Sequence, residues 1–164
     1  MDMMNAKVAQ AINDQIKNEL QSAYTYLSMA SWCVKKNLDG FAQWMKVQAK
    51  EETGHAMRLF EYLHNRGADV ELQALEKPQN KWDSITQVFQ DVFRNEKAVT
   101  ASINALVDLS ITEKEHATKT ILHWFLEEQV EEEATAQKIL ERLELIGKDP
   151  AGILFLDKEM GARA

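Results

Sequence analysis

Apolar residues recur three or four positions apart along four long segments of this 164-residue chain. At about 3.6 residues per turn, this spacing places them on one stripe of a helix. The pattern therefore predicts four long amphipathic helices that bury their stripes against one another. Their expected ranges run from about Asn5 to Lys36, from Asp39 to near Gly67, from Asp83 or Ser84 to about Ser110, and from Thr112 to Gly147.

Two of these boundaries carry residue types that commonly cap helices. Asp39 can cap the second helix, because a short acidic side chain at this position accepts bonds from free backbone amides. Thr112 and Glu115 stand three residues apart and can form a capping box for the fourth helix. We therefore expect side-chain caps at the starts of both helices.

The lengths of the connections predict how the helices are arranged. Short links around Asn37 to Gly40 and around Ser110 to Thr112 join the helices into two antiparallel hairpins. The segment from Ala68 to Trp82 contains Pro78 and shows no helical pattern. Extended, its roughly 15 residues reach about 50 Å, whereas a helix of about 27 residues is about 40 Å long. The sequence predicts an all-α four-helix bundle with one long crossover between helices two and three.

A fifth, short helix is expected near the end of the chain. Asp149 and Pro150 have the residue types of a cap and of a first helical position. The helix then carries four consecutive apolar residues, Ile153 to Leu156. These residues either fold onto the end of the bundle or contact neighbouring subunits.

Composition narrows the class of protein and its partners. Only two prolines and six glycines interrupt a sequence rich in helix formers, and the length suits a single domain spanning 1–164. The net charge of -7 and the lack of a basic block argue against nucleic acid or an anionic membrane as partner. No apolar run approaches the roughly 18 residues of a membrane span. With one cysteine and no segment resembling a signal peptide, we expect a cytoplasmic protein.

Each long helix carries one acid in the middle of its apolar stripe. These four acids are Glu19, Glu52, Glu96 and Glu132, and His55 follows Glu52 by three residues. All four lie about three to four turns from a helix end, so they can meet at one level of the bundle. Burying one unpaired carboxylate costs several kcal/mol, roughly, and divalent ions can supply the compensating charge. Oxygen ligands with one or two imidazoles suit iron or manganese.

This set of ligands predicts a centre with two metal ions. Glu52 is central and is expected to bridge the ions. We assign Glu19 and His55 to one ion, and Glu96 and Glu132 to the other.

Two further polar residues are expected at this centre. Gln129 lies one turn before Glu132 on the same helix face, where its amide can hydrogen-bond a bound ligand. We therefore count Gln129 among the metal-site residues and among the catalytic residues. Tyr26 lies two turns after Glu19 and can point inward as a phenol that donates a hydrogen bond or an electron. We predict that both take part in catalysis.

Together these motifs resemble the non-haem ferritins of bacteria and archaea. The stretches that carry the resemblance are Asn18-Glu19-Leu20, Tyr26, Glu51-Glu52-x-x-His55, Glu96, Glu128-Gln129-x-Glu131-Glu132-Glu133 and Leu154-Phe155-Leu156-Asp157-Lys158-Glu159. The resemblance implies a ferritin-like bundle with a short fifth helix, and a ferroxidase that uses dioxygen or hydrogen peroxide to oxidise Fe(II) at a di-iron centre. It also implies storage of an Fe(III) mineral inside a homo-oligomeric shell of 24 subunits. A third iron site is implied beside the pair, at Glu51, Glu128, Glu131 and Glu132.

Departures from related families exclude other cofactors. Bacterioferritins resemble this pattern but add a second ExxH motif and a haem-binding methionine, and Thr53 stands at the position of that methionine. Haem is therefore not expected. Rubrerythrin-like enzymes would add a Cys-x-x-Cys pair, and this chain has one cysteine.

Two alternatives remain open. The chain can instead be a di-metal carboxylate bundle that stores nothing, whose metal is structural or whose substrate is organic. The run from Glu131 to Glu133 can also be a solvated helix face without a third ion. Size in solution discriminates the first alternative from a storage shell.

Overall fold

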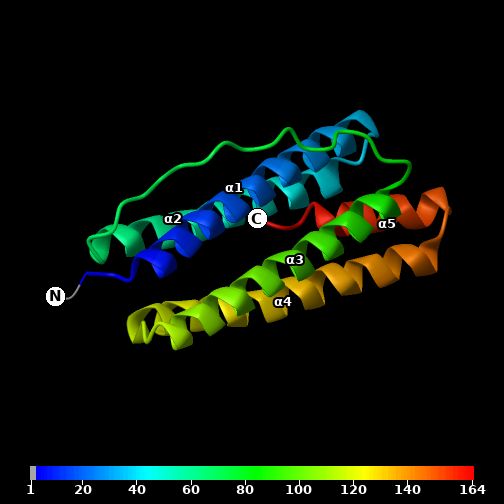
Figure 1. The fold of residues 1–164 in the computed structure, drawn as a ribbon. Helices are drawn as coiled ribbons and strands as arrows, with labels where there is room; N and C mark the ends of the chain where they lie inside the picture. Colours follow the sequence, from blue (N-terminus) through cyan, green and yellow to red (C-terminus); the bar gives the residue numbers. More distant parts are fainter. Residues whose placement is uncertain (1–2) are drawn as a thin grey trace.

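The computed structural model describes residues 3–164, which form five α-helices and no strand (Figure 1). The helices are α1 (Ala6–Lys35), α2 (Asp39–Asn65), α3 (Ile85–Thr112), α4 (His116–Ile146) and α5 (Pro150–Met160). α1 and α2 form one antiparallel hairpin, and α3 and α4 form the other. The predicted fold, a four-helix bundle with a crossover and a short terminal helix, is confirmed.

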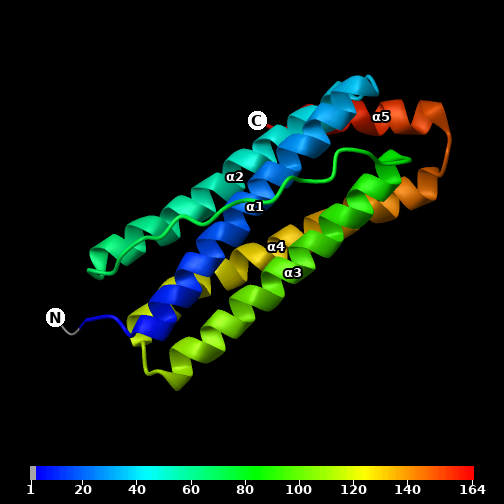
Figure 2. The same cartoon turned by 45° about the horizontal axis from the view of Figure 1, so that its top comes forward.

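The crossover, residues 66–84, runs the length of the first hairpin and carries the chain from the end of α2 to the opposite end of the bundle, where α2 began and α3 now begins (Figure 2). Side chains at Asn13, Gln21 and Ser28 of α1, about two turns apart, bond its backbone. Asn13, for example, donates to the carbonyl of Asp69 at 3.0 Å and accepts from the amide of Glu71 at 2.8 Å. These bonds pair polar backbone groups of the crossover, which have no hydrogen-bond partner within a helix.

Side chains cap α3 at Ser84 and α5 at the predicted cap Asp149. The Ser84 side chain accepts from the amide of Gln87 at 3.1 Å and begins α3. Asp149 accepts from the amides of Ala151 and Gly152 and begins α5, with Pro150 as its first residue.

The two other capping predictions are wrong. α2 already begins at Asp39, and Leu38 occupies the cap position without a side-chain bond. Thr112 is the last residue of α3, while Glu115 caps α4 through its backbone only. Its carboxylate instead accepts from Arg66 Nη2 at 2.9 Å, so a contact distant in sequence replaces the local capping bond.

A layer of polar side chains divides the core of the bundle into two apolar clusters. The cluster nearer α5 includes Phe41, Trp44, Met45, Phe89 and Leu156. The cluster at the opposite end includes Ile12, Leu59, Leu63, Ile103 and Leu122. The polar layer between them, at mid-bundle, contains buried Glu19, Glu52, His55, Glu96 and Gln129. The fold therefore places these charged groups far from both ends of the bundle.

The apolar run of α5 is only partly buried. Leu156 and Met160 are buried against the bundle, whereas Leu154 and Phe155 are 57% and 65% exposed. Leu156 thus folds onto the bundle end, and the two residues before it are exposed. α5 also folds back along α2, so its last residues lie beside the body of the bundle (Figure 1).

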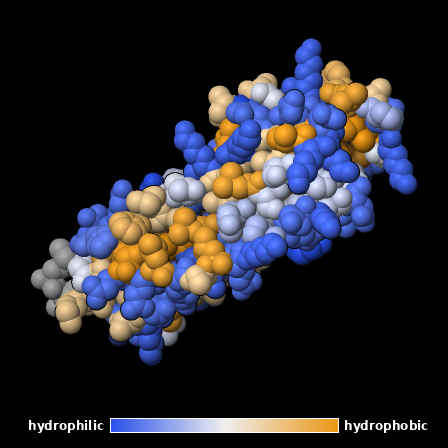
Figure 3. Space-filling view, turned by 90° about the horizontal axis from the view of Figure 1, so that it is seen from above, coloured by the Kyte–Doolittle hydropathy of each residue, from blue (hydrophilic) through white to orange (hydrophobic). Residues whose placement is uncertain are grey.

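Further apolar side chains are exposed on the face along which the crossover runs (Figure 3). On α1 they are Tyr24 and Leu27, and on the crossover Leu72 and Leu75. Large exposed apolar areas mark surfaces that contact other chains. None of the helices in residues 3–164 combines the length and apolar character needed to cross a membrane.

Gly40 permits the close approach of α5 to α2. A Cβ at this position would overlap the backbone carbonyl oxygen of Asp157 and lie 3.0 Å from the amide nitrogen of Gly161. The same contact is reinforced by the Asp157 carboxylate, which accepts from the amide of Phe41 at 2.8 Å. A residue without a side chain is therefore required here.

We expect Gly40→Ala to lower the thermal unfolding midpoint of the metal-free protein, because overpacking of this kind costs about 1–3 kcal/mol. Gly54→Ala is the matched control on the same helix. A Cβ at Gly54 meets nothing within 4 Å, so alanine should stabilise the helix by about 0.5–1 kcal/mol. Circular dichroism during heating measures both midpoints. If the Gly40→Ala protein is as stable as the parent, the close contact is not needed.

Candidate metal centre

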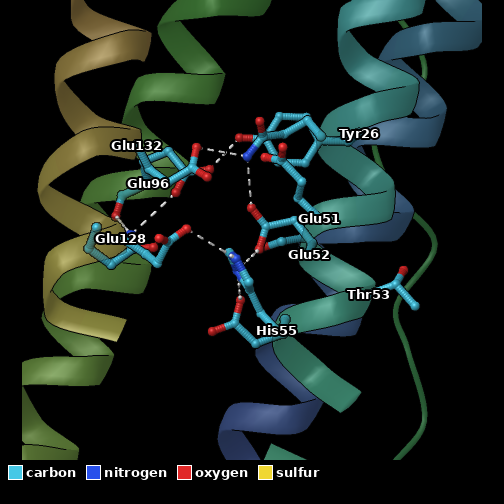
Figure 4. A network of polar contacts seen from close by, with 12 residues as sticks. Tyr26, Glu51, Glu52, Thr53, His55, Glu96, Glu128 and Glu132 are labelled. Atoms are coloured by element: carbon cyan, nitrogen blue, oxygen red, sulfur yellow. Dashed lines mark hydrogen bonds and ion pairs between the residues drawn. The ribbon is translucent and has the colours of Figure 1, made fainter. Parts of the chain in front are cut away.

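All four long helices supply a side chain to the polar layer at mid-bundle (Figure 4). These are Glu19 from α1, Glu52 and His55 from α2, Glu96 from α3, and Glu132 from α4. Figure 4 shows the acids of α3 and α4 facing Glu52 and His55 across the space between the hairpins. The four helices thus bring together the acids that the sequence placed at one level.

Three ligand atoms converge at the first of two clusters. His55 Nδ1 lies 3.3 Å from Glu52 Oε2 and 3.8 Å from Glu19 Oε2. All three atoms are buried, and none has a hydrogen-bond partner. Unpaired buried polar atoms are rare and cost about 1–3 kcal/mol each. Nitrogen and oxygen atoms that converge without bonding one another fit a metal ion between them.

The second cluster lies on the other side of the imidazole. Here His55, Glu128 and Glu132 each offer one ligand atom within 4.8 Å of the others. His55 Nε2 lies 3.8 Å from Glu128 Oε2. Glu128, which the sequence placed only in a third site, is therefore adjacent to the central histidine.

Glu96 is held by the two residues predicted to be catalytic. The Tyr26 hydroxyl donates to Glu96 Oε1, and Tyr26 is buried. Gln129 Nε2 lies 3.3 Å from Glu96 Oε2 and 3.2 Å from the backbone carbonyl oxygen of Glu96. Both side chains point inward, as expected, and both orient the same carboxylate.

Two glutamines complete the centre, and the sequence analysis missed their role. Gln15 Nε2 donates to Glu19 Oε1 at 2.9 Å. Gln48 Nε2 donates to Glu52 Oε1 at 3.0 Å and to Glu132 Oε2 at 2.8 Å. The available signal was a glutamine four residues before an acid, which puts both on one helix face. Each glutamine fixes one oxygen of its acid and leaves the other facing the cluster.

Burial strongly affects the protonation of the centre. It raises the pKa of Glu52 and of Glu96 to about 7, and that of Glu132 to about 8. Burial alone would lower the pKa of His55, but attraction to Glu19 and Glu52 outweighs it and raises this pKa to about 10. The centre therefore holds protons near neutral pH that a bound cation would displace.

The acids expected at a third site do not form one cluster within residues 3–164. Glu128 lies near His55, as described, whereas Glu131 is exposed on α4. Glu51 is also exposed and pairs with Arg163, whose Nη2 lies 2.7 Å from its carboxylate. Thr53 points away from the centre in Figure 4. A third ion would thus need Glu51 and Glu131 to rearrange.

A bundle with one long crossover and carboxylate and histidine side chains projecting into its core is the architecture of ferritin-like metal proteins. Comparison with known proteins agrees: residues 9–146 match the family model for the ferritin-like domain. The chain belongs to the ferritin family.

Individual relatives match nearly the whole chain. A bacterial non-heme ferritin of Bacteroides fragilis is 40% identical over 161 residues, which cover 98% of this chain and 100% of the relative. One from Campylobacter jejuni is 36% identical and covers 95% of this chain and 93% of its own. The structure of an open pore ferritin from Archaeoglobus fulgidus superposes with a TM-score of 0.97 at 46% identity, covering 98% of both chains. The resemblance to bacterial and archaeal non-haem ferritins is confirmed.

The raised pKa values predict how pH affects the metal-free protein. Glu52, Glu96, Glu132 and His55 all hold protons to higher pH when folded than when unfolded. The free energy of unfolding should therefore decrease as pH rises from about 5 to about 9. Saturating Zn²⁺ should stabilise the protein more at higher pH, because it needs deprotonated ligands.

Thermal unfolding across this pH range, with chelator or with Zn²⁺, measures both effects. Glu132→Gln should give a shallower decrease, since it removes one of the groups with a raised pKa. Glu61→Gln, an exposed position on α2, is the control and should match the parent. A metal-free protein that becomes more stable with rising pH would contradict these protonation states.

Proposed function

We propose that the chain is an iron-storage protein with ferroxidase activity. Fe(II) is its substrate, and Fe(III) is deposited as a mineral inside a shell of 24 subunits. One observation carries the proposal: the buried atoms Glu19 Oε2, Glu52 Oε2 and His55 Nδ1 converge without hydrogen-bond partners. A fold that only needed stability would pair or remove such groups. Membership of the ferritin family supports iron as the ion.

We assign the ligand roles as follows. Glu52 would bridge two ions, because one of its oxygens faces His55 and the other shares the amide nitrogen of Gln48 with Glu132. Glu19 and His55 hold one ion. Glu96 and Glu132 hold the second, on the side where Tyr26 and Gln129 fix Glu96.

The electron and proton balance of oxidation is simple. Two Fe(II) ions each give one electron to dioxygen, which takes up two protons and becomes hydrogen peroxide. With hydrogen peroxide as oxidant, two Fe(II) ions and two protons convert it to two molecules of water. Ion binding releases protons from His55 and from the carboxylates with raised pKa values, so protons are available beside the oxidant.

Tyr26 and Gln129 are the proposed catalytic residues. The Tyr26 hydroxyl donates to Glu96, so the phenol can give an electron to the reduced oxygen species while its proton passes to that carboxylate. Gln129 also donates to Thr100 Oγ1 at 3.2 Å, and this second bond holds its amide beside Glu96. It can hydrogen-bond a ligand at the second ion.

A third iron site is proposed beside the pair, at Glu51, Glu128, Glu131 and Glu132. Their spacing on α4 supports it, because residues three and four apart share a helix face. An ion there can leave the pair for the mineral or supply a further electron. Glu51, Glu128 and Glu131 need not be in place for the pair to form, whereas Glu132 is shared with the pair.

Two exposed apolar surfaces support assembly into a closed shell. One is formed by α1 and the crossover, at Tyr24, Leu27 and Leu72, and the other by Leu154 and Phe155 of α5. Surfaces on different faces let one subunit contact several copies of itself, as closed symmetric assemblies require.

Aerobic addition of Fe(II) to the metal-free protein tests the proposal against the alternative of a non-storage di-metal bundle. Absorbance and sedimentation should be followed together. We expect Fe(III) to accumulate in a particle of 24 chains of 18.8 kDa, roughly half a megadalton. A monomer or dimer that turns over or binds metal without storing it would support the alternative instead.

Replacement of the bridging acid tests the ligand assignment. Glu52→Ala should reduce the initial rate of Fe(II) oxidation at least about tenfold, since both ions lose a ligand. The shell should still assemble, because removing a buried acid relieves its desolvation. Glu61→Ala, further along α2 and exposed, is the control. Unchanged initial rates in Glu52→Ala would refute the bridging role.

A further inference from the structure

The end of the chain returns to the metal centre. After α5 ends at Met160, the last residues lie beside the middle stretch of α2 (Figures 1 and 2). Gln43 of α2 donates to the backbone carbonyl of Arg163 at 3.4 Å. This contact directs the Arg163 side chain along α2 towards the centre.

The Arg163 guanidinium makes three contacts on α2, each about one turn from the next. Its Cζ lies 4.7 Å from the centroid of the Trp44 ring, which provides a stacking surface. Nη1 donates to Gln48 Oε1 at 3.0 Å, and Nη2 donates to Glu51 Oε2 at 2.7 Å. The Arg163 side chain is only 24% exposed, so these contacts are partly shielded from water.

The contact with Gln48 determines which end of that amide faces the metal centre. An arginine only donates hydrogen bonds, so it must meet the oxygen of the amide. The amide nitrogen of Gln48 is then turned inward, where it donates to Glu52 at 3.0 Å and to Glu132 at 2.8 Å. Arg163 therefore fixes a hydrogen-bond donor against two of the proposed ligands without touching them itself.

The contact with Glu51 places a fixed positive charge on an acid of the proposed third site. An ion that uses Glu51 must share this carboxylate with the guanidinium, whose positive charge weakens the attraction of the acid for a second cation. We propose that Arg163 is a positioning residue of the metal centre, which orients Gln48 and competes with an incoming ion for Glu51. This inference rests on the proposed metal centre.

A second arginine provides a matched control for a purely structural role. Arg142 Nη2 pairs with Glu159 at 2.7 Å and ties α4 to α5, as Arg163 ties the end of the chain to α2. Arg142 makes no polar contact with the centre among those found in residues 3–164. If Arg163 only fastened the chain end, replacing either arginine should have the same effect on metal binding.

Calorimetric titration with Zn²⁺ tests the competition without any oxidation chemistry. In Arg163→Ala, we expect the weakest Zn²⁺ site of each subunit to bind about three- to tenfold more tightly than in the parent. In Arg142→Ala it should be unchanged. The difference between Arg163→Ala and the parent should shrink in roughly 1 M salt, which screens the pair with Glu51. Arg163→Lys should fall between, since a point charge keeps the competition but loses the paired contacts.

Further outcomes separate this inference from the proposed function. The double variant Arg163→Ala, Glu131→Ala should lose the gain, because the third site then lacks a ligand. A gain that persists there, or equal isotherms for Arg163→Ala and the parent, would overturn the role of Arg163 and leave the pair of tight sites intact. If the parent binds no Zn²⁺ tightly, the metal centre itself is wrong. Arg163 lies beyond the last helix, so the Arg163→Ala protein should still form the shell of the parent, which sedimentation checks.

Discussion

The burial of carboxylates in the middle of an apolar bundle is the constraint on which the rest of this structure depends. Glu19, Glu52 and Glu96 are each about 1% exposed, although a charge in such surroundings is strongly disfavoured. Three features compensate for this burial. Glutamines and a tyrosine donate hydrogen bonds to the carboxylate oxygens, His55 supplies a positive charge, and the raised pKa values keep some of the acids protonated. In Glu19, Glu52 and His55 one atom still lacks a hydrogen-bond partner and is available to a cation. The same layer splits the hydrophobic core into two clusters, so packing on both sides holds the acids in place.

Much of the fold was predictable because its signals are local. Helical periodicity gave the four long helices, and the unpatterned segment around Pro78 gave the crossover. Capping was predictable only where the cap had no competing partner. Ser84 and Asp149 bond their own helices, whereas the carboxylate of Glu115 bonds Arg66, a residue far away in sequence.

The residues of the centre were predictable where their meeting depends only on how far along its helix each one lies. Equal distance from the helix ends brought Glu19, Glu52 and Glu96 to one level. The direction of each side chain was not predictable, since it depends on neighbours from other helices, as the position of Glu128 beside His55 shows. The contact of Arg163 with Gln48 could not be predicted from the sequence, because the position of Arg163 depends on α5 folding back over Gly40.

The crossover has a consequence for how the centre forms. One hairpin carries Glu19, Glu52 and His55, and the other carries Glu96 and Glu132. In the proposed centre each hairpin is thus half of a chelator, and residues 66–84 are the tether that joins the halves. Its bonds to α1 shorten its free length, which raises the effective concentration of one half at the other. An ion bound by Glu52, Glu96 and Glu132 would then act as a cross-link between the two hairpins.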